Sequence, residues 1–443
     1  MRLEGWGRYP RHESEIVTLS APDDLGRILR ERSGIIARGN GRAYGDAAIG
    51  ASATLLAGSL NRMRAFDPAT GRLTVEAGVL LSEILESFVP RGFFPPVVPG
   101  TKLVSVGGMI AADVHGKNHH RDGGFGAHLQ SLRLALPGGE VVDCSPQENG
   151  ELFAATVGGM GLTGIILEAT LVLRRIETSW IVQNTTVAPD LAGALAALDQ
   201  TDDATYSVAW IDCLARGASL GRSLIFAGEH ASREEVAAAG PARDLLPSAP
   251  AARLGVPIDL PGWTLNRASV AAFNELYFRR GAMAGRERQL VHWNPYFFPL
   301  DSVARWNRIY GARGFLQHQC VVPRANAQPV LAEILERFAR SGKASFLAVL
   351  KKLGAGSGLL SFPMEGYTLA LDVKVSDDIF PLLDEIDRLV VAAGGRLYLA
   401  KDARQSRETF EAGYPRLGEF RALRRASGAE HRIESHLSRR LGL

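Results

Sequence analysis

The sequence predicts an α+β protein in which glycine-rich loops precede a larger antiparallel sheet. Three glycine-rich loops lie before residue 165. From about Glu177, strand-like runs alternate with amphipathic helices, which is typical of a sheet covered by helices. The tail from Gly394 then returns to a strand followed by a helix. We therefore expect three segments, residues 1–176, 177–393 and 394–443, with the last returning to the first.

The N-terminal segment contains short strands and helices between its loops. GIIARGNGRAYGD predicts a buried strand from Gly34 to Arg38 that runs into the first loop. Arg72–Gly78 alternates like a strand, and the following LSEILESFVPRG predicts a helix that ends at the proline and glycine. Leu132–Leu136 and Val141–Asp143 flank PGGE, so they predict a β-hairpin.

The middle segment predicts a largely antiparallel sheet. Expected strands are Trp180–Val187, Tyr206–Asp212, Ser223–Phe226, Phe315–Val322, Ser345–Lys351 and Tyr367–Val375, with helices near residues 190–198, 329–340 and 379–393. Residues 228–263 are rich in Ala, Pro and Gly, and there Ser232 and Glu235 can form a capping box. The rest of this stretch predicts a long mobile loop.

The first two glycine-rich loops are candidates for binding an anionic ligand. Gly39 and Gly41 stand beside Arg38 and Arg42, a combination that suits a pyrophosphate, although a solvent-exposed turn with two surface arginines fits as well. The second loop, PGTKLVSVGGMIAADVHGKNHH from Pro99 to His120, can donate successive backbone N–H groups to an anion. A pair of tight loops is the alternative interpretation of the second loop.

The third loop carries G-x-G-x-x-G at Gly159, Gly161 and Gly164. The context of this motif excludes a Rossmann site, because GIILEATLVLRR after it predicts a long strand where a phosphate-binding helix would have to begin. Three glycine-rich loops, a different middle domain and a returning tail together indicate a large dinucleotide held by a non-Rossmann fold.

Composition excludes several classes of protein. The net charge is +3, from 50 basic and 47 acidic residues without a long basic run, which gives no electrostatic case for nucleic acid. Three distant cysteines without a CxxC suggest neither a disulfide framework nor a zinc site, and we expect no metal. No signal peptide and no membrane span are visible, so a cytoplasmic protein is the default expectation.

At this point a resemblance to a known family adds to these inferences. RGNGRAYGD, the Pro99–His120 loop and ATVGGMGLTGIILEAT resemble the FAD domain of the vanillyl-alcohol-oxidase-type (PCMH-type) flavoproteins. GWGR, FFPLD, GFLQHQ, SFLAVLKKLG and GGRLYLAKDARQ extend the similarity over nearly the whole chain, to the decaprenylphosphoryl-β-D-ribose 2′-oxidase family. The resemblance implies a PCMH-type FAD domain of two α/β subdomains, a substrate domain and a C-terminal segment that returns to the active site.

The family implies a reaction and its partners. FAD would accept the hydride when the 2′-hydroxyl of a polyprenyl-phosphate-linked ribofuranose is oxidised to a ketone, the first half of epimerisation to arabinose, a precursor of cell-wall arabinan. A separate short-chain NAD(P)H-dependent reductase would complete it. Many relatives in the wider superfamily bond a histidine covalently to the flavin, but Arg42 stands there, which implies non-covalent FAD. A lipid-linked substrate also implies peripheral membrane contact, for which residues 228–263 are the candidate.

The resemblance also implies the site residues. The FAD would be held by Arg38, Gly39, Asn40, Gly41, Arg42, Ala43, Tyr44, Pro99, Gly100, Thr101, Ser105, Val106, Gly107, Gly108, Ala112, His115, Gly116, Asn118, Gly161, Thr163, Gly164, Ile166, Tyr398 and Lys401. The catalytic residues would be Lys401, His115 and Tyr398. The substrate would contact Lys117, Phe297, Gln317, Gln319, Lys351 and Thr368.

Several residues keep an alternative interpretation. His115 could be a hydrogen-bonded structural histidine, and without the resemblance Gln317 and Gln319 would be a polar strand face. Mycobacterial members carry an asparagine and a cysteine where this chain has Thr368 and Ala370, so covalent inhibition at that cysteine is not expected here. Two rival functions remain: a soluble alditol or aldonolactone oxidase on the same fold, and a non-catalytic flavin-binding subunit.

Overall fold

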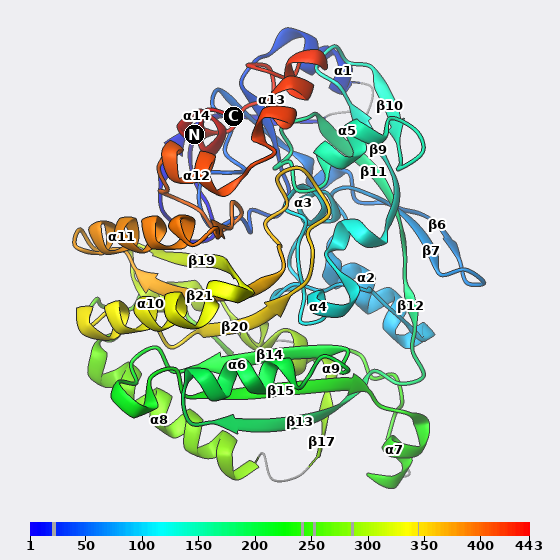
Figure 1. Cartoon of the computed structure of the whole chain (residues 1–443). Helices are drawn as coiled ribbons and strands as arrows, with labels where there is room; N and C mark the ends of the chain where they lie inside the picture. The colour runs from blue at the N-terminus through cyan, green and yellow to red at the C-terminus, as the bar shows by residue number, and fades with distance from the viewer. Residues whose placement is uncertain (20–23, 241–242, 251–253, 285–287, 344) are drawn as a thin grey trace.

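One parallel and two antiparallel sheets organise the chain in a computed structural model, which describes residues 1–19, 24–240, 243–250, 254–284, 288–343 and 345–443 (Figure 1). The predicted α+β class is confirmed. The smallest of the three sheets is parallel and has the order β3–β5–β4, formed by Glu15–Thr18, Ala53–Leu56 and Ile35–Arg38. Helix α1 (Asp24–Glu31) precedes β4 and buries Leu25, Ile28 and Leu29.

The C-terminal tail packs against this parallel sheet. Ile433 pairs with Ile35, and Ser435 pairs with Gly50. Helices α12 (Arg407–Gly413), α13 (Leu417–Ala426) and α14 (His436–Leu441) add buried residues to the same apolar cluster as the sheet. Ile433 lies before α14 and Leu437 and Leu441 lie on it, and all three are buried. The tail is therefore part of the core that carries the first glycine-rich loop.

An antiparallel sheet of order β10–β9–β11–β7–β6 follows. Its strands are Val141–Cys144, Leu129–Ala135, Ile165–Val172, Arg72–Glu76 and Met63–Asp67. The predicted hairpin is β9–β10, and β11 follows Gly164 directly, which confirms that no phosphate-binding helix begins there. Helices α2 (Leu81–Phe88), α3 (Val106–Ala111) and α5 (Gly150–Thr156) bury apolar residues beside the sheet.

The largest sheet is antiparallel throughout, with the order β17–β13–β15–β14–β20–β21–β19–β22. Its strands are Gln289–His292, Trp180–Ala188, Ser223–His230, Tyr206–Ile211, Ala348–Leu353, Gly366–Lys374, Phe315–Pro323 and Arg396–Leu397. Helices α6 (Leu191–Asp199), α10 (Ala327–Ser341) and α11 (Ile379–Ala392) share one apolar core with the sheet (Figure 1).

The two faces of this sheet differ because side chains alternate along each strand. On β19, β20 and β21 the residues in the helix-covered core include Leu316, Leu350 and Leu369. Their neighbours Gln317, Lys351 and Thr368 point to the opposite face, where they line a cavity. Helix α8 (Arg267–Ala284) packs on β13 and β15, and α9 (Trp293–Phe297) lies next to β17. One sheet face is therefore structural and the other is available for a ligand.

Short elements complete the described chain: β1 (Arg2–Glu4), β2 (Arg11–Glu13), β8 (Phe93–Phe94), β12 (Arg174–Arg175), β16 (Leu254–Gly255), β18 (Val303–Ala304), α4 (His119–Asp122) and α7 (Arg233–Ala238). The predicted capping box of Ser232 and Glu235 begins α7. Residues 241–242 and 251–253 of the predicted mobile loop lie outside the described residues, so its mobility stays a prediction, as do the domain boundaries. Within the described ranges, no helix is both long and apolar enough to cross a bilayer.

Candidate active site

A cavity of about 1130 Å³ lies between the open face of the large sheet and the three glycine-rich loops. Its lining includes residues of all three loops, of strands β14, β19, β20 and β21, and of the turn that carries Lys401. Ligand pockets commonly measure about 300–1,000 Å³. This cavity is therefore large enough for a dinucleotide and a second ligand together.

The first loop, after β4, brings its backbone to the cavity. Gly41 has a φ of 63°, a left-handed conformation that favours glycine. A Cβ atom on Gly39 would lie 2.0 Å from the Oγ of Ser105, so no larger residue fits there unless the second loop moves. The side-chain amide of Asn40 donates to the carbonyl of Leu103 at 2.8 Å. These contacts hold the first two loops together.

The two arginines of the first loop have different surroundings. Arg42 lines the cavity, and its guanidinium carbon lies 4.0 Å from the centre of the Trp6 ring. Its Nε is buried and has no hydrogen-bond partner among the described residues. Arg38 does not line the cavity, because its guanidinium donates to the carbonyls of Glu4 (2.8 Å) and Ala48 (3.3 Å). Of the two arginines expected at a pyrophosphate, only Arg42 thus reaches the cavity, and its role there stays a prediction.

Asp301 fixes the second loop at the edge of the cavity by accepting hydrogen bonds from it. The Thr101 hydroxyl and the Lys102 backbone N–H both donate to Asp301, each at 2.8 Å. Ser105 caps α3, accepting from the N–H of Gly108. Pro99, Gly100, Gly107 and Gly108 line the cavity, whereas Val106 is fully buried and does not. Asp301, which we did not predict, therefore positions the loop.

The HGKNHH motif (His115–His120) contributes its first three residues to the cavity and others to the core. His115, Gly116 and Lys117 line the cavity. Asn118 turns away, donating to the carbonyl of Pro96 and to Asp122, both at 2.7 Å. His119 Nδ1 accepts from the backbone N–H of Gly354 at 3.0 Å, and burial lowers the pKa of this histidine to about 3. The second half of the motif is therefore structural.

The third loop divides similarly. Gly161, Gly164 and Ile166 line the cavity. Thr163 is fully buried, and its hydroxyl lies 2.9 Å from that of Thr156. Arg38, Val106, Asn118 and Thr163 are thus the predicted cofactor residues that the structure does not bring to the cavity. The remaining predicted cofactor residues, including Ala43, Tyr44 and Ala112, line it.

His115 belongs to a short series of hydrogen-bonded side chains that line the cavity. The Gln319 amide donates to His115 Nε2 at 3.0 Å and to the Thr368 hydroxyl at 3.2 Å. Burial, reinforced by the charge of Lys351, lowers the pKa of His115 well below its ordinary value. With Nε2 accepting from Gln319, the neutral ring carries its proton on Nδ1, which has no partner among the described residues.

Three lysines line the cavity, and two of them are predicted substrate residues. Burial lowers the pKa of Lys117 to about 7 and that of Lys351 to about 8, and Lys351 also lowers the pKa of Lys117. Lys117 Nζ donates to the carbonyl of Tyr296 and lies 4.2 Å from the centre of that ring. Lys401 is the third of these lysines. A nearby anion stabilises the charged form of a buried amine. The cluster of lysines therefore favours binding of an anionic ligand.

Lys401 has an aromatic and an acidic neighbour. Its Nζ lies 3.7 Å from the centre of the Tyr44 ring. Burial lowers its pKa, the negative charge of Asp372 opposes this shift, and Lys351 adds to it. Asp372 is fully buried and accepts from the Gln317 amide, and burial raises its pKa. Tyr398 donates to the carbonyl of Ala112 at 3.1 Å and stacks on Phe362.

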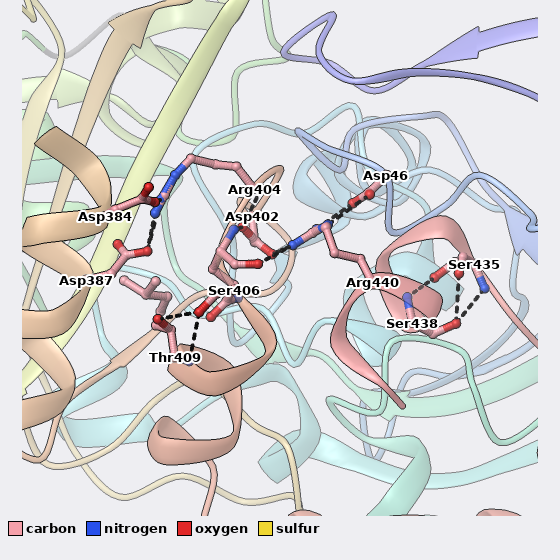
Figure 2. Close-up of polar contacts among 12 residues, drawn as sticks. Asp46, Asp384, Asp387, Asp402, Arg404, Ser406, Thr409, Ser435, Ser438 and Arg440 are labelled. Atoms are coloured by element: carbon pink, nitrogen blue, oxygen red, sulfur yellow. Dashed lines mark hydrogen bonds and ion pairs between the residues drawn. The ribbon is translucent and has the colours of Figure 1, made fainter. Parts of the chain in front are cut away.

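The C-terminal tail fixes the turn that carries Lys401 (Figure 2). Arg440 donates to Asp46 at 2.9 Å and to Asp402 at 3.0 Å, and also to the carbonyl of Gln405. Asp402 follows Lys401, and Asp46 follows the first glycine loop, so one guanidinium ties this loop to the turn that carries Lys401. Although burial alone would raise the pKa of Asp402, Arg440 and two backbone N–H groups lower it.

The predicted substrate residues all reach the cavity. Lys117, Phe297, Gln317, Gln319, Lys351 and Thr368 line it, as do Trp210, Tyr277 and Asp301, which we did not predict. Asp372 was also missed. It pairs in register with Gln317, two residues beyond Ala370 on the same strand face, so the strand period could have indicated it. The catalytic and substrate roles of these residues stay predictions.

The lining fits a dinucleotide. Gly116, like Gly39, leaves no room for a side chain, because a Cβ there would lie 2.9 Å from the carbonyl of Val98. The space between the loops therefore depends on glycine at these positions. Two buried polar atoms, Arg42 Nε and His115 Nδ1, lack partners among the described residues. Comparison with known families agrees, since residues 15–145 match the model of the FAD binding domain. FAD is the cofactor, and the chain is an FAD-dependent oxidoreductase.

Similar proteins narrow the class. Decaprenylphosphoryl-beta-D-ribose oxidase of Mycolicibacterium smegmatis is 37% identical over 453 aligned positions, covering 100% of this chain and 97% of the relative. A Streptomyces coelicolor protein from the mprA 5′ region is 37% identical over 82% of this chain and 100% of its own length. A putative D-arabinono-1,4-lactone oxidase of Neurospora crassa is 29% identical over only 33% of this chain and 26% of its own length. The chain belongs to the decaprenylphosphoryl-β-D-ribose oxidase family.

Proposed function

We propose that this enzyme oxidises the 2′-hydroxyl of a polyprenyl-phosphate-linked ribofuranose to the 2′-ketone. The carbon loses a hydride and the hydroxyl loses a proton, so the sugar loses two electrons. FAD, when bound, supplies the hydride acceptor. The keto product passes to a separate short-chain NAD(P)H-dependent reductase, which returns a hydride from the other face and gives the arabino sugar, the precursor of cell-wall arabinan.

The cluster of Lys117, Lys351 and Lys401 on one side of the cavity carries this proposal. A sugar phosphodiester brings a negative charge into a site where burial has lowered lysine pKa values. Lys117 and Lys351 bind the phosphate as point charges. A neutral polyol or lactone would bring no counter-ion to Lys117 and Lys351, on which no described carboxylate acts, and this disfavours the soluble alditol or aldonolactone oxidase.

The remaining side chains orient the sugar. Gln319 connects His115 and Thr368, so it fixes the imidazole and a hydroxyl on the same sheet face. Lys401 supplies a positive charge where water is excluded, which stabilises negative charge that develops during oxidation. Arg42 stands where many relatives carry the histidine that bonds covalently to the flavin, and an arginine cannot form that bond, which supports non-covalent binding of FAD.

Anaerobic absorbance of the enzyme-bound flavin tests the proposal. Mixing the holoenzyme with polyprenyl-phosphoribose should bleach the flavin, and Lys401→Ala should slow this by roughly 10²–10³-fold, the typical effect of removing one electrostatic group at a reacting centre. Lys374→Ala, at the half-buried end of β21 and outside the cavity lining, is the control. Bleaching by free alditols or lactones would favour the soluble oxidase, and no bleaching by any sugar would favour a flavin-binding role.

A further inference from the structure

Helix α8 exposes apolar side chains on its outer face. Leu276 and Met283 are 68% and 70% exposed, and Phe273 and Tyr277 are also exposed. Spacings of three, four, seven and ten residues place these four side chains on one stripe of the helix. Val270 and Asn274 are buried and lie three residues before Phe273 and Tyr277, so the stripe that packs on the sheet is next to the exposed one. The helix is thus anchored by one stripe and leaves an apolar stripe without a partner among the described residues.

The chain before α8 adds to this surface. Trp263 is 76% exposed, and Leu254 and Ile258 are similarly exposed. Strand β16, which contains Leu254, pairs with β18. We call the seven exposed residues the apolar rim: Leu254, Ile258, Trp263, Phe273, Leu276, Tyr277 and Met283. Apolar side chains gathered in this way mark an interaction surface more often than chance exposure does.

The apolar rim is continuous with the cavity. Tyr277 lines the cavity, and its ring centre lies 4.9 Å from that of Trp210, which also lines it. Phe273 lies 5.8 Å from Tyr277 and 6.0 Å from Phe346. Both residues of β18 border the cavity as well. Tyr277 is exposed and also lines the cavity, so the α8 part of the rim borders the opening of the cavity.

Unpaired positive charge accompanies the rim. Arg267 and Arg280 on α8 and Arg305 beside β18 are exposed, and none has an acidic partner among the residues that the structure describes. The acidic residues nearby are already engaged: Glu275 pairs with Arg222 and Arg279, and Asp259 pairs with Arg8 and Arg308. The surface therefore combines exposed apolar groups with free cationic ones, as helices that lie on anionic membranes do.

We propose that the apolar rim docks on the surface of an anionic lipid bilayer, with the cavity mouth facing the lipid. A lipid-linked sugar then enters from the bilayer while its polyprenyl chain stays among the acyl chains. The proposal rests on the proposed function. It assigns membrane contact mainly to α8, whereas the sequence pointed to residues 228–263. Unpaired arginines favour an anionic bilayer over a second copy of this basic surface, because two copies would bring like charges together.

Co-sedimentation of the FAD-loaded enzyme with vesicles tests the surface. We expect binding to vesicles of phosphatidylcholine mixed with phosphatidylglycerol and roughly tenfold weaker binding by Leu276→Glu/Met283→Glu, because charged groups do not enter the acyl region. Met63→Glu/Val141→Glu, at two exposed apolar positions of the N-terminal sheet, should bind like the wild type. Arg267→Gln/Arg280→Gln should remove most of the preference for phosphatidylglycerol, whereas Arg2→Gln/Arg388→Gln should not.

Three outcomes would overturn the docking surface: no binding by the wild type, equal binding by the α8 variant, or a wild-type dimer that the α8 variant dissolves. Flavin content and melting temperature verify that every variant is folded. Turnover of polyprenyl-phosphoribose in detergent separates the two proposals. An enzyme that oxidises this substrate but ignores vesicles keeps its function and loses the surface, while vesicle binding without any turnover would reject the function alone.

Discussion

The two ends of the cavity are constructed in opposite ways. At the end formed by the glycine loops, the shape depends on side chains that are missing, and backbone groups face the ligand. At the other end, long polar side chains line the cavity, and three of them are lysines: Lys351 on the open face of the large sheet, Lys117 on the second loop and Lys401 on the turn after β22. Backbone recognition suits a cofactor that is the same in many enzymes, while the side chains can change with the substrate.

The relatives differ in how much of this chain they match. The M. smegmatis oxidase matches the whole chain, whereas the N. crassa protein, named as a lactone oxidase, matches only a third of it. One fold can host different substrates when the residues of its site change. Variants that disable one end, or both, can therefore establish whether the ends are as independent as their construction suggests.

Arg440→Met should have the largest effect, because Arg440 ties the first glycine loop to the turn that carries Lys401 through Asp46 and Asp402. Removing it leaves two buried carboxylates without a counter-ion, which costs about 3 kcal/mol of unfolding free energy. Urea unfolding of the holoenzyme measures this loss. Arg439→Met is the control, because Arg439 is exposed and pairs with Glu434 on the same tail, so that its loss separates no segments of the site and should cost less. Equal losses for the two variants would contradict a clamping role.

Gly39→Ala should damage the glycine end alone. Its Cβ would lie 2.0 Å from Ser105 Oγ, so the first two loops must separate. We expect FAD to bind roughly tenfold more weakly, a change of about 1.4 kcal/mol, as measured by fluorescence titration of the apoprotein. Gly58→Ala serves as the control, because its Cβ would meet nothing within 4 Å. Unchanged FAD affinity in Gly39→Ala would show that the loops adapt.

Lys351→Met should damage the lysine end alone. Losing one cation from the phosphate site should raise the KM for the lipid-linked sugar about tenfold, or 1.4 kcal/mol, with little change in kcat and in FAD content. Lys352→Met is a matched control, because Lys352 is the next residue of β20 and pairs with Asp199 and Asp202. A drop in kcat without a change in KM would assign Lys351 to the chemical step.

The glycine-loop end and the lysine end of the cavity also differ in how well the sequence predicts them. Glycine loops have local signals, so the first and third loops could be located before the fold was known. A motif does not give the direction of each side chain, and for this reason Arg38, Asn118 and Thr163 were expected in the cavity but point elsewhere. Helix α8 was not predicted, because its apolar residues lie on the exposed stripe as well as the buried one.

The lysine end depends on long-range register, which a single sequence does not show without a family resemblance. Lys351 faces its partner Thr368, and Gln317 faces Asp372, only because β20, β21 and β19 pair as they do. The resemblance supplied Lys351 and Gln317 as site residues. It did not supply Asp372. The carboxylate of Asp372 affects the pKa of Lys401 only because β21 brings the two residues close together.

Asp372→Asn should produce the smallest change, a shift in pH dependence. The Asp372 carboxylate raises the pKa of Lys401 against the effect of burial, so without it the amine loses its proton at a lower pH. If protonated Lys401 supports oxidation, the high-pH limb of the kcat profile should move to lower pH by about one unit. Asp301→Asn is the control, because Asp301 is a half-buried carboxylate at the cavity that is not among the charges acting on Lys401. A limb that moves to higher pH, or moves equally in both variants, would mean that Asp372 does not hold the proton on Lys401.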